Sequence, residues 1–163
     1  MVSINLSKFP FDINQETNYY CIPAGILSIL KYYDDEIKIT QDELFKLMSP
    51  DISFGAVKKL TFKDFTFDIK YPETNCFTKQ CFSNWFKIIK DEIDQSKPVA
   101  ISFRLDSRNV HTKVAVAYDT SNLWLFDPAP FTQRPVQYSF QDAEKEFAKQ
   151  DRCGDMIIVN YHG

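Results

Sequence analysis

Four side chains of this sequence have the types and the order that nucleophilic catalysis by a thiol requires. Cys21 opens the apolar stretch CIPAGILSILKYY, and Gln15 lies six positions before it. A thiol at a helix N-terminus is favoured as thiolate by unpaired backbone N–H groups and the helix dipole. A glutamine amide one short loop upstream can donate a hydrogen bond to an oxyanion that forms on an attacked carbonyl.

The base and its orienting group come from the second half of the chain. Only two histidines are present: His162 lies in the C-terminal tail, whereas His111 opens the apolar run HTKVAVAY. Asp127 ends the next apolar run, LWLFDP. Taken singly, these residues also have structural explanations, as a buried thiol, a residue at the rim of a sheet or a turn starter. Their joint placement favours a Cys–His pair with an orienting carboxylate.

Alternation along the histidine strand adds a prediction about packing. The residues expected on the face of His111 are Lys113, Ala115 and Ala117. Small alanine side chains beyond the histidine would leave room for the cysteine helix to approach, as a hydrogen-bonded Cys–His pair needs. The hairpin that follows would bring Asp127 beside His111.

Apolar periodicity predicts helices in the first part of the chain. We expect them at about Asn18–Tyr33, from Thr40 to Met48, briefly after Ser53, and over Cys81–Gln95. Thr40 and Glu43 have the spacing of a capping box. Pro23 would fall in the first turn of its helix, where the missing N–H group costs nothing.

After Pro98 the apolar period changes from about 3.6 to about 2 residues. The expected strands are Val99–Leu105, His111–Tyr118, Leu123–Phe126 and Met156–Tyr161, with a short helix over Ser139–Lys149 before the last. Helices followed by strands predict an α+β fold in which N-terminal helices, including the cysteine helix, pack on a C-terminal antiparallel sheet.

Composition narrows the class of protein. The chain has 163 residues without repeats or linkers, so we expect a single domain over residues 1–163. Its net charge is −3 and no basic stripe accompanies the aromatic residues, which argues against a nucleic-acid partner. Neither a signal peptide nor a membrane-spanning run is recognisable. We therefore expect a cytoplasmic protein, or one exported without a cleaved signal.

Metal or disulfide chemistry has little support in the sequence. The acidic cluster Asp34-Asp35-Glu36 lacks the ligand spacing of a calcium loop and is expected to be a solvated turn. Cys76, Cys81 and Cys153 lack metal-type spacing, and histidine is scarce, so no zinc site is expected. We interpret these three cysteines as core or incidental thiols in a domain too large to need disulfides.

The segments around these residues resemble the papain-like cysteine peptidase superfamily. The resemblance is closest to the branch of bacteriocin-leader (double-glycine) peptidases, in stand-alone form. Those relatives show a Gln, a Cys-Gly-Pro-Ala helix start, a His-headed strand running into Gly-Tyr-Asp, and a strand ending in Asp-Pro. The matching stretches here are Gln15, Cys21–Ala24, Leu30–Tyr33, His111 through Asp119, and Asp127-Pro128.

The resemblance implies a papain-like fold and a role for each candidate residue. Cys21 would be the nucleophile, His111 the general base and acid, Asp127 the orienting residue and Gln15 the oxyanion donor, with no metal or cofactor. Ile22 and Ala117 stand where those relatives have glycine. From this we expect Ile22 to reshape the groove beside the thiol.

Three functions fit this constellation. The first is hydrolysis of a peptide or other amide bond in a peptide or protein substrate. The second is acyl transfer or glutamine deamidation through the same thioester, for example by a secreted or injected effector. The third is a non-catalytic peptide-binding module. Degenerate relatives of that last kind usually lack the nucleophile or the base, whereas Cys21, His111 and Asp127 are all present.

Overall fold

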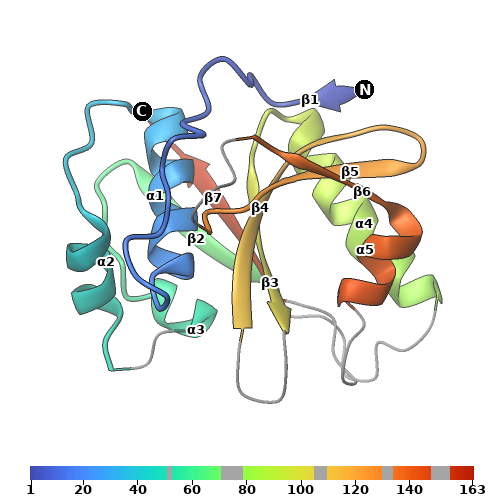
Figure 1. Cartoon of the computed structure of the whole chain (residues 1–163). Helices are drawn as coiled ribbons and strands as arrows, with labels where there is room; N and C mark the ends of the chain where they lie inside the picture. The colour runs from blue at the N-terminus through green and yellow to red at the C-terminus, as the bar shows by residue number, and fades with distance from the viewer. Residues whose placement is uncertain (51–52, 71–78, 105–109, 130–133, 148–154) are drawn as a thin grey trace.

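A computed structural model describes residues 1–50, 53–70, 79–104, 110–129, 134–147 and 155–163 (Figure 1). Its helices are α1 (Cys21–Tyr33), α2 (Gln41–Met48), α3 (Phe54–Val57), α4 (Lys79–Asp94) and α5 (Phe140–Phe147). Its strands are β1 (Val2–Ser3), β2 (Phe65–Lys70), β3 (Val99–Arg104), β4 (Val110–Tyr118), β5 (Asn122–Phe126), β6 (Val136–Ser139) and β7 (Met156–Tyr161). No helix in these described ranges has the length and apolar character needed to cross a membrane.

The described strands form one antiparallel sheet between two layers of helices. The strand order is β2-β7-β3-β4-β5-β6, and β1 pairs with β4. Helix α1 packs against β4, β3 and β7 on one side of the sheet, while α4 and α5 cover the other side (Figure 1). The predicted α+β architecture, with the cysteine helix on an antiparallel sheet, is confirmed.

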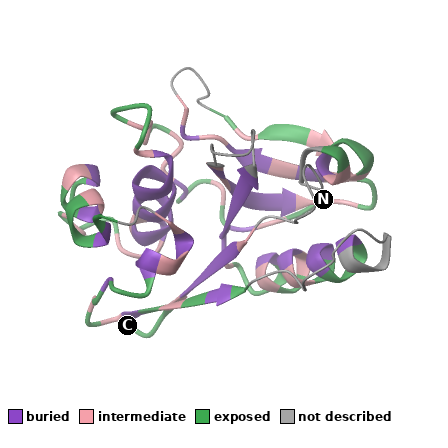
Figure 2. Ribbon diagram, turned by 90° about the horizontal axis from the view of Figure 1, so that it is seen from below, coloured by how far each residue is buried: buried purple, intermediate pink, exposed green. Residues whose placement is uncertain are grey.

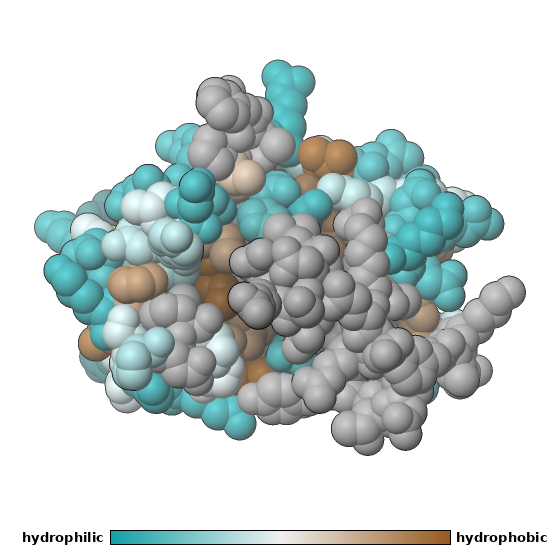
Figure 3. All heavy atoms as spheres, turned by 60° about the horizontal axis from the view of Figure 1, so that its bottom comes forward, coloured by the Kyte–Doolittle hydropathy of each residue, from teal (hydrophilic) through white to brown (hydrophobic). Residues whose placement is uncertain are grey.

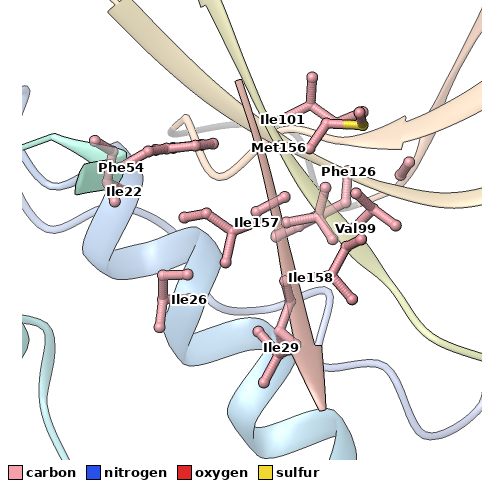
Figure 4. Close-up of a cluster of buried hydrophobic side chains, with 14 of the residues drawn as sticks. Ile22, Ile26, Ile29, Phe54, Val99, Ile101, Phe126, Met156, Ile157 and Ile158 are labelled. Atoms are coloured by element: carbon pink, nitrogen blue, oxygen red, sulfur yellow. The ribbon is translucent and has the colours of Figure 1, made fainter. Parts of the chain in front are cut away.

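Helix α1 is buried almost all round (Figure 2). Ile26 and Ile29 are fully buried and face Ile157 of β7 in the hydrophobic core (Figure 4). The helix begins at Cys21 rather than at Asn18, because residues 17–20 form a turn closed by the Tyr20 N–H group and the Thr17 carbonyl. The thiol therefore belongs to the first helical residue.

The capping box of α2 is present as predicted. The Thr40 hydroxyl accepts the Glu43 N–H at 3.2 Å, and the Glu43 carboxylate accepts the Thr40 N–H at 2.8 Å. Helix α4 was predicted over Cys81–Gln95, and its apolar face is buried; that face comprises Phe82, Trp85, Phe86, Ile89 and Ile93. Local patterns therefore located these two helices correctly.

Three strands were not expected from the sequence. β1 and β6 are very short, and β2 pairs along its whole length with the C-terminal β7, from Phe65 opposite Tyr161 to Lys70 opposite Met156. Alternation of Phe65, Phe67 and Ile69 with polar residues was a usable signal for β2. The end of the predicted Ser139–Lys149 helix, Cys76, Cys153 and the side chain of Cys81 lie outside the described residues.

The prediction that α1 packs against the face of β4 that carries His111 is wrong. A side chain at Gly25 would meet Thr112 Cγ2 at 3.0 Å and Val114 Cγ2 at 3.6 Å, so α1 lies against the face of β4 that carries these residues. His111 and Ala115 belong to the opposite face by alternation. Helix α1 can approach β4 closely because Gly25 has no side chain. The alanines on the face of His111 do not provide the room for this approach.

A β-bulge in β4 explains why Ala117 was also assigned to the wrong face. Ala115 pairs with Leu125, but Ala117 pairs with Trp124, so the register shifts between the two alanines. A bulge inserts one extra residue and turns the following side chains to the other face. Ala117 therefore does not share the face of His111, although strict alternation predicted that it would.

We expect Gly25→Val to lower the free energy of unfolding by about 1–3 kcal/mol, because two added methyl groups must displace Thr112 and Val114. The matched control is Lys87→Val on the exposed face of α4, which should cost about 1 kcal/mol or less. Urea unfolding monitored by circular dichroism measures both. Equal losses in the two variants would contradict the close-contact interpretation.

Candidate active site

Cys21 lies at the N-terminus of α1, at the same end of the molecule as the start of β4 (Figure 1). The residue is buried, with 7% of its surface exposed. Tyr20, the residue that precedes the helix, makes no side-chain capping hydrogen bond. The first N–H groups of α1 thus receive no cap from it, and they lie beside the thiol.

His111 and Asp127 are joined across neighbouring strands. The His111 Nε2 atom lies 2.6 Å from Asp127 Oδ1, and the same oxygen accepts the Ala129 N–H at 2.9 Å. The Asp127 carboxylate is therefore hydrogen-bonded both to the His111 ring and to a backbone N–H group. The expectation that the β4–β5 hairpin brings Asp127 beside His111 is confirmed in the geometry.

The Cys21 thiol completes a hydrogen-bonded chain with these two residues. It is hydrogen-bonded to the His111 ring and to the backbone N–H of Thr112. Because Nε2 of His111 faces Asp127, the ring atom left for the sulfur is Nδ1. The fully buried Thr112 hydroxyl lies near the thiol and has no hydrogen-bond partner among the described residues.

Burial and hydrogen bonding act in opposite directions on the pKa values of this site. Burial raises the pKa of Cys21, but the His111 hydrogen bond and charge, with Thr112, bring it below its ordinary value. Burial disfavours a charged His111, yet Asp127 and Cys21 raise its pKa to about 9. Burial also opposes ionisation of Asp127, but His111 and the Ala129 N–H hold its pKa below the usual range. The three interactions therefore favour a charged thiolate, imidazolium and carboxylate over their neutral forms.

Lys113 belongs to the same cluster, although no role was predicted for it. Its Nζ atom lies 3.5 Å from Asp127 Oδ2 and donates to the Tyr138 hydroxyl at 2.7 Å. The ammonium also lies over the rings of Phe103 and Tyr138, 5.0 and 4.7 Å from their centroids. Its positive charge contributes to the lowered pKa of Asp127. The sequence held one signal for such a role, because Lys113 is a charged residue within the otherwise apolar run HTKVAVAY.

Gln15 is placed beside Asp127 through its backbone. The Gln15 N–H donates to the carbonyl of Pro128 at 2.6 Å. Its side-chain Oε1 atom is buried without a hydrogen-bond partner in the described part of the chain. The structure therefore brings the Gln15 segment next to the carboxylate, while the amide itself is not held by Cys21, His111 or Asp127.

Ile22, which was expected to reshape the groove beside the thiol, follows Cys21 in the first turn of α1. The side chain is buried in the hydrophobic core, close to Phe54 and Ile26 (Figure 4). Figure 3 brings forward the lower end of the molecule as drawn in Figure 1, and hydrophobic residues are visible near the centre of that face. No cluster of metal-ligating side chains occurs within the described ranges.

Comparisons with known proteins show the family and the fold of the chain. Residues 8–152 match the sequence profile of the Peptidase_C39 like family. No curated protein shows a significant match to the chain. The peptidase domain of Streptococcus ComA, a bi-functional ABC transporter involved in a quorum sensing pathway, has a similar structure. It superposes with a TM-score of 0.61 at 18% identity, covering 91% of this chain and 96% of that domain.

A crystal structure described as a C39-like peptidase from Bacillus anthracis is also similar. It superposes with a TM-score of 0.66 at 14% identity over 100% of both chains. At these identities the likeness concerns the fold, and it confirms the predicted papain-like architecture. Together with the profile match, it shows that this chain belongs to the Peptidase_C39 like family and has the papain-like fold of cysteine peptidases.

Proposed function

We propose that this protein is a cysteine peptidase that cleaves a peptide or other amide bond through a thioester on Cys21. The observation that carries the proposal is the hydrogen-bonded chain from the Cys21 thiol through His111 to Asp127. Membership of the Peptidase_C39 like family supports peptidase chemistry at this site. The substrate class is therefore a peptide or protein with an accessible carbonyl.

In the first half of the reaction, the Cys21 thiolate adds to the substrate carbonyl carbon and the C=O electron pair moves to oxygen. The Gln15 amide and the backbone N–H of Cys21 stabilise this oxyanion, each donor being worth about 3 kcal/mol of barrier. The His111 imidazolium gives its proton to the leaving amine as the C–N bond breaks. The product on the enzyme is a thioester.

In the second half, His111 takes a proton from water as the water oxygen attacks the thioester carbonyl. The C–S bond breaks, the carboxylic acid product leaves, and the thiolate–imidazolium pair is restored. Asp127 accepts a hydrogen bond from the ring throughout and keeps the imidazole oriented. Lys113 balances the buried negative charge of Asp127.

A panel of electrophilic peptide, ubiquitin-like and glutamine probes, followed by intact-mass analysis, tests the proposal. We expect one adduct on Cys21 with peptide probes, and release of peptide products that have gained one water during turnover. Adducts on Cys21 without any hydrolysed product, or transfer of the acyl group to an added amine alone, would contradict hydrolysis. Absence of any adduct on Cys21 would contradict thiol catalysis altogether.

Iodoacetamide at pH about 6 should alkylate Cys21 well before Cys76, Cys81 or Cys153, because an unperturbed thiol with pKa about 8.5 is mostly protonated there. His111→Ala should slow this reaction strongly, since the imidazolium that lowers the pKa of Cys21 is removed while burial still raises it. Peptide mapping by mass spectrometry measures the rate at each cysteine.

His162→Ala is the matched control for that variant. His162 is exposed and is hydrogen-bonded to Thr66 at 3.0 Å, on the β2–β7 side of the sheet. Alkylation of Cys21 and peptide turnover should both stay near wild type. Loss of thiol reactivity in His162→Ala, or its retention in His111→Ala, would reverse the assignment of the base.

Asp127→Asn should shift the alkaline limb of the kcat/KM profile to lower pH. The carboxylate raises the pKa of His111 to about 9, so removing its charge lets burial lower that pKa and the imidazolium is lost earlier as pH rises. Much of the activity at the new optimum should remain, because an amide oxygen still accepts the ring N–H; Asp127→Ala should lose more. Titration of kcat/KM from pH 5 to 10 measures the shift, and an unmoved alkaline limb would contradict it.

Gln15→Ala should lower kcat by about 10²–10³ with little change in KM, as expected for a donor that acts on the oxyanion. Alkylation of Cys21 at pH about 6 should survive, because iodoacetamide attack forms no oxyanion. Steady-state kinetics and the alkylation rate are measured on the same preparation. If this variant unfolds or loses thiol reactivity, Gln15 has a structural role, and the oxyanion must be bound by backbone donors of α1.

A further inference from the structure

The side chain of Gln41, the first residue of α2, is a buried amide with a specific set of partners. Only 3% of Gln41 is exposed. Its Nε2 atom donates to the Asn14 carbonyl at 2.7 Å, and its Oε1 atom accepts the Glu16 N–H at 3.1 Å. Buried polar groups are costly unless they are paired, and this amide pairs both of its ends with backbone.

The two partners flank Gln15, the proposed oxyanion donor. Gln41 is hydrogen-bonded to the residue before Gln15 and to the residue after it, and the Gln15 N–H itself donates to the Pro128 carbonyl. Three hydrogen bonds, two with Gln41 of α2 and one with Pro128 after β5, therefore hold the backbone around Gln15. None of them uses the Gln15 side chain, so the amide stays available for substrate.

Helix α2 also contacts the residue that precedes the nucleophile. The Tyr20 hydroxyl donates to Asp42 at 3.0 Å, and the Tyr20 ring lies 4.9 Å from the ring of Phe45. Gln41 and Asp42 are consecutive residues in the first turn of α2. One helix end thus locates both the segment of the oxyanion donor and the start of the nucleophile helix relative to each other.

We propose that Gln41 is a positioning residue that sets the Gln15 amide relative to the Cys21 thiol by clamping the backbone on both sides of Gln15. The inference rests on the proposed function of Gln15. A donor must lie within hydrogen-bond distance of the oxyanion to stabilise it, so a displacement of about 1 Å is enough to weaken catalysis strongly. Gln41 does not touch the substrate in this role.

The test is a double-mutant cycle of Gln41→Met and Gln15→Ala. Methionine has a similar volume and cannot replace either hydrogen bond of the clamp. We expect Gln41→Met to lower kcat by about tenfold or more while KM changes less than about twofold, as for loss of an interaction made in the transition state. In the Gln15→Ala background the same substitution should have no further effect on kcat.

Two controls separate positioning from loss of structure. Thr40→Ala removes the capping box of α2 but leaves the Gln41 amide in place, so it should lower stability and leave kcat near wild type. Alkylation of Cys21 at pH about 6 should be unchanged in Gln41→Met. If that variant does not fold, Gln41→Asn replaces it, because it keeps an amide that is too short to reach both partners.

Each outcome bears on one of the two proposals. Unchanged kcat in Gln41→Met, together with a large loss in Gln15→Ala, overturns the clamp and leaves the oxyanion role of Gln15 intact. Multiplying losses in the double mutant, or an equal loss in Thr40→Ala, also overturn the clamp. Unchanged kcat in Gln15→Ala itself overturns the oxyanion role, on which the clamp rests.

Discussion

The contact between the first turns of α1 and the start of β4 is the constraint on which the site depends. Cys21 is hydrogen-bonded to His111 and Thr112 at this contact, and one turn later Gly25 lies against Thr112 and Val114. A thiol and an imidazole share a proton only within hydrogen-bond distance, so the depth of this packing decides the chemistry. The absence of a side chain at Gly25 is what permits that depth.

Burial at this contact would by itself keep the thiol and the imidazole neutral. The charged forms are favoured because each of these groups lies beside a group of opposite charge: Cys21 beside His111, His111 beside Asp127, and Asp127 also beside Lys113. In a low-dielectric environment such neighbouring charges act more strongly than in water. The same burial that opposes ionisation therefore strengthens the interactions that restore it.

The proposed oxyanion donor is held by a different set of contacts. The Gln15 backbone is bound by Pro128 after β5 and, through its neighbours, by Gln41 of α2. Helix α2 thereby contributes to the site although it carries none of the residues of the hydrogen-bonded chain. Helix α1, helix α2 and the sheet each supply one part of the arrangement.

The sequence alone was sufficient for features that depend on neighbouring residues. Helix periodicity and Pro23 located Cys21 at a helix start, Thr40 and Glu43 formed the predicted capping box, and the β4–β5 hairpin joined His111 to Asp127. These features arise from interactions within one helix or between strands joined by a short turn. Residue types and their spacing along the sequence predict such local interactions directly.

Only the tertiary structure decided which face of β4 meets α1, and which distant residues support the site. The bulge after Ala115 breaks the alternation from which the face of Ala117 was predicted. Gly25 contacts Thr112 and Val114, which lie almost ninety positions later in the sequence. Lys113 and Gln41 likewise find partners across the fold, at Asp127 and Tyr138 and on the backbone beside Gln15. These contacts depend on how separate helices and strands pack together, and the spacing of residues along the sequence does not reveal that packing.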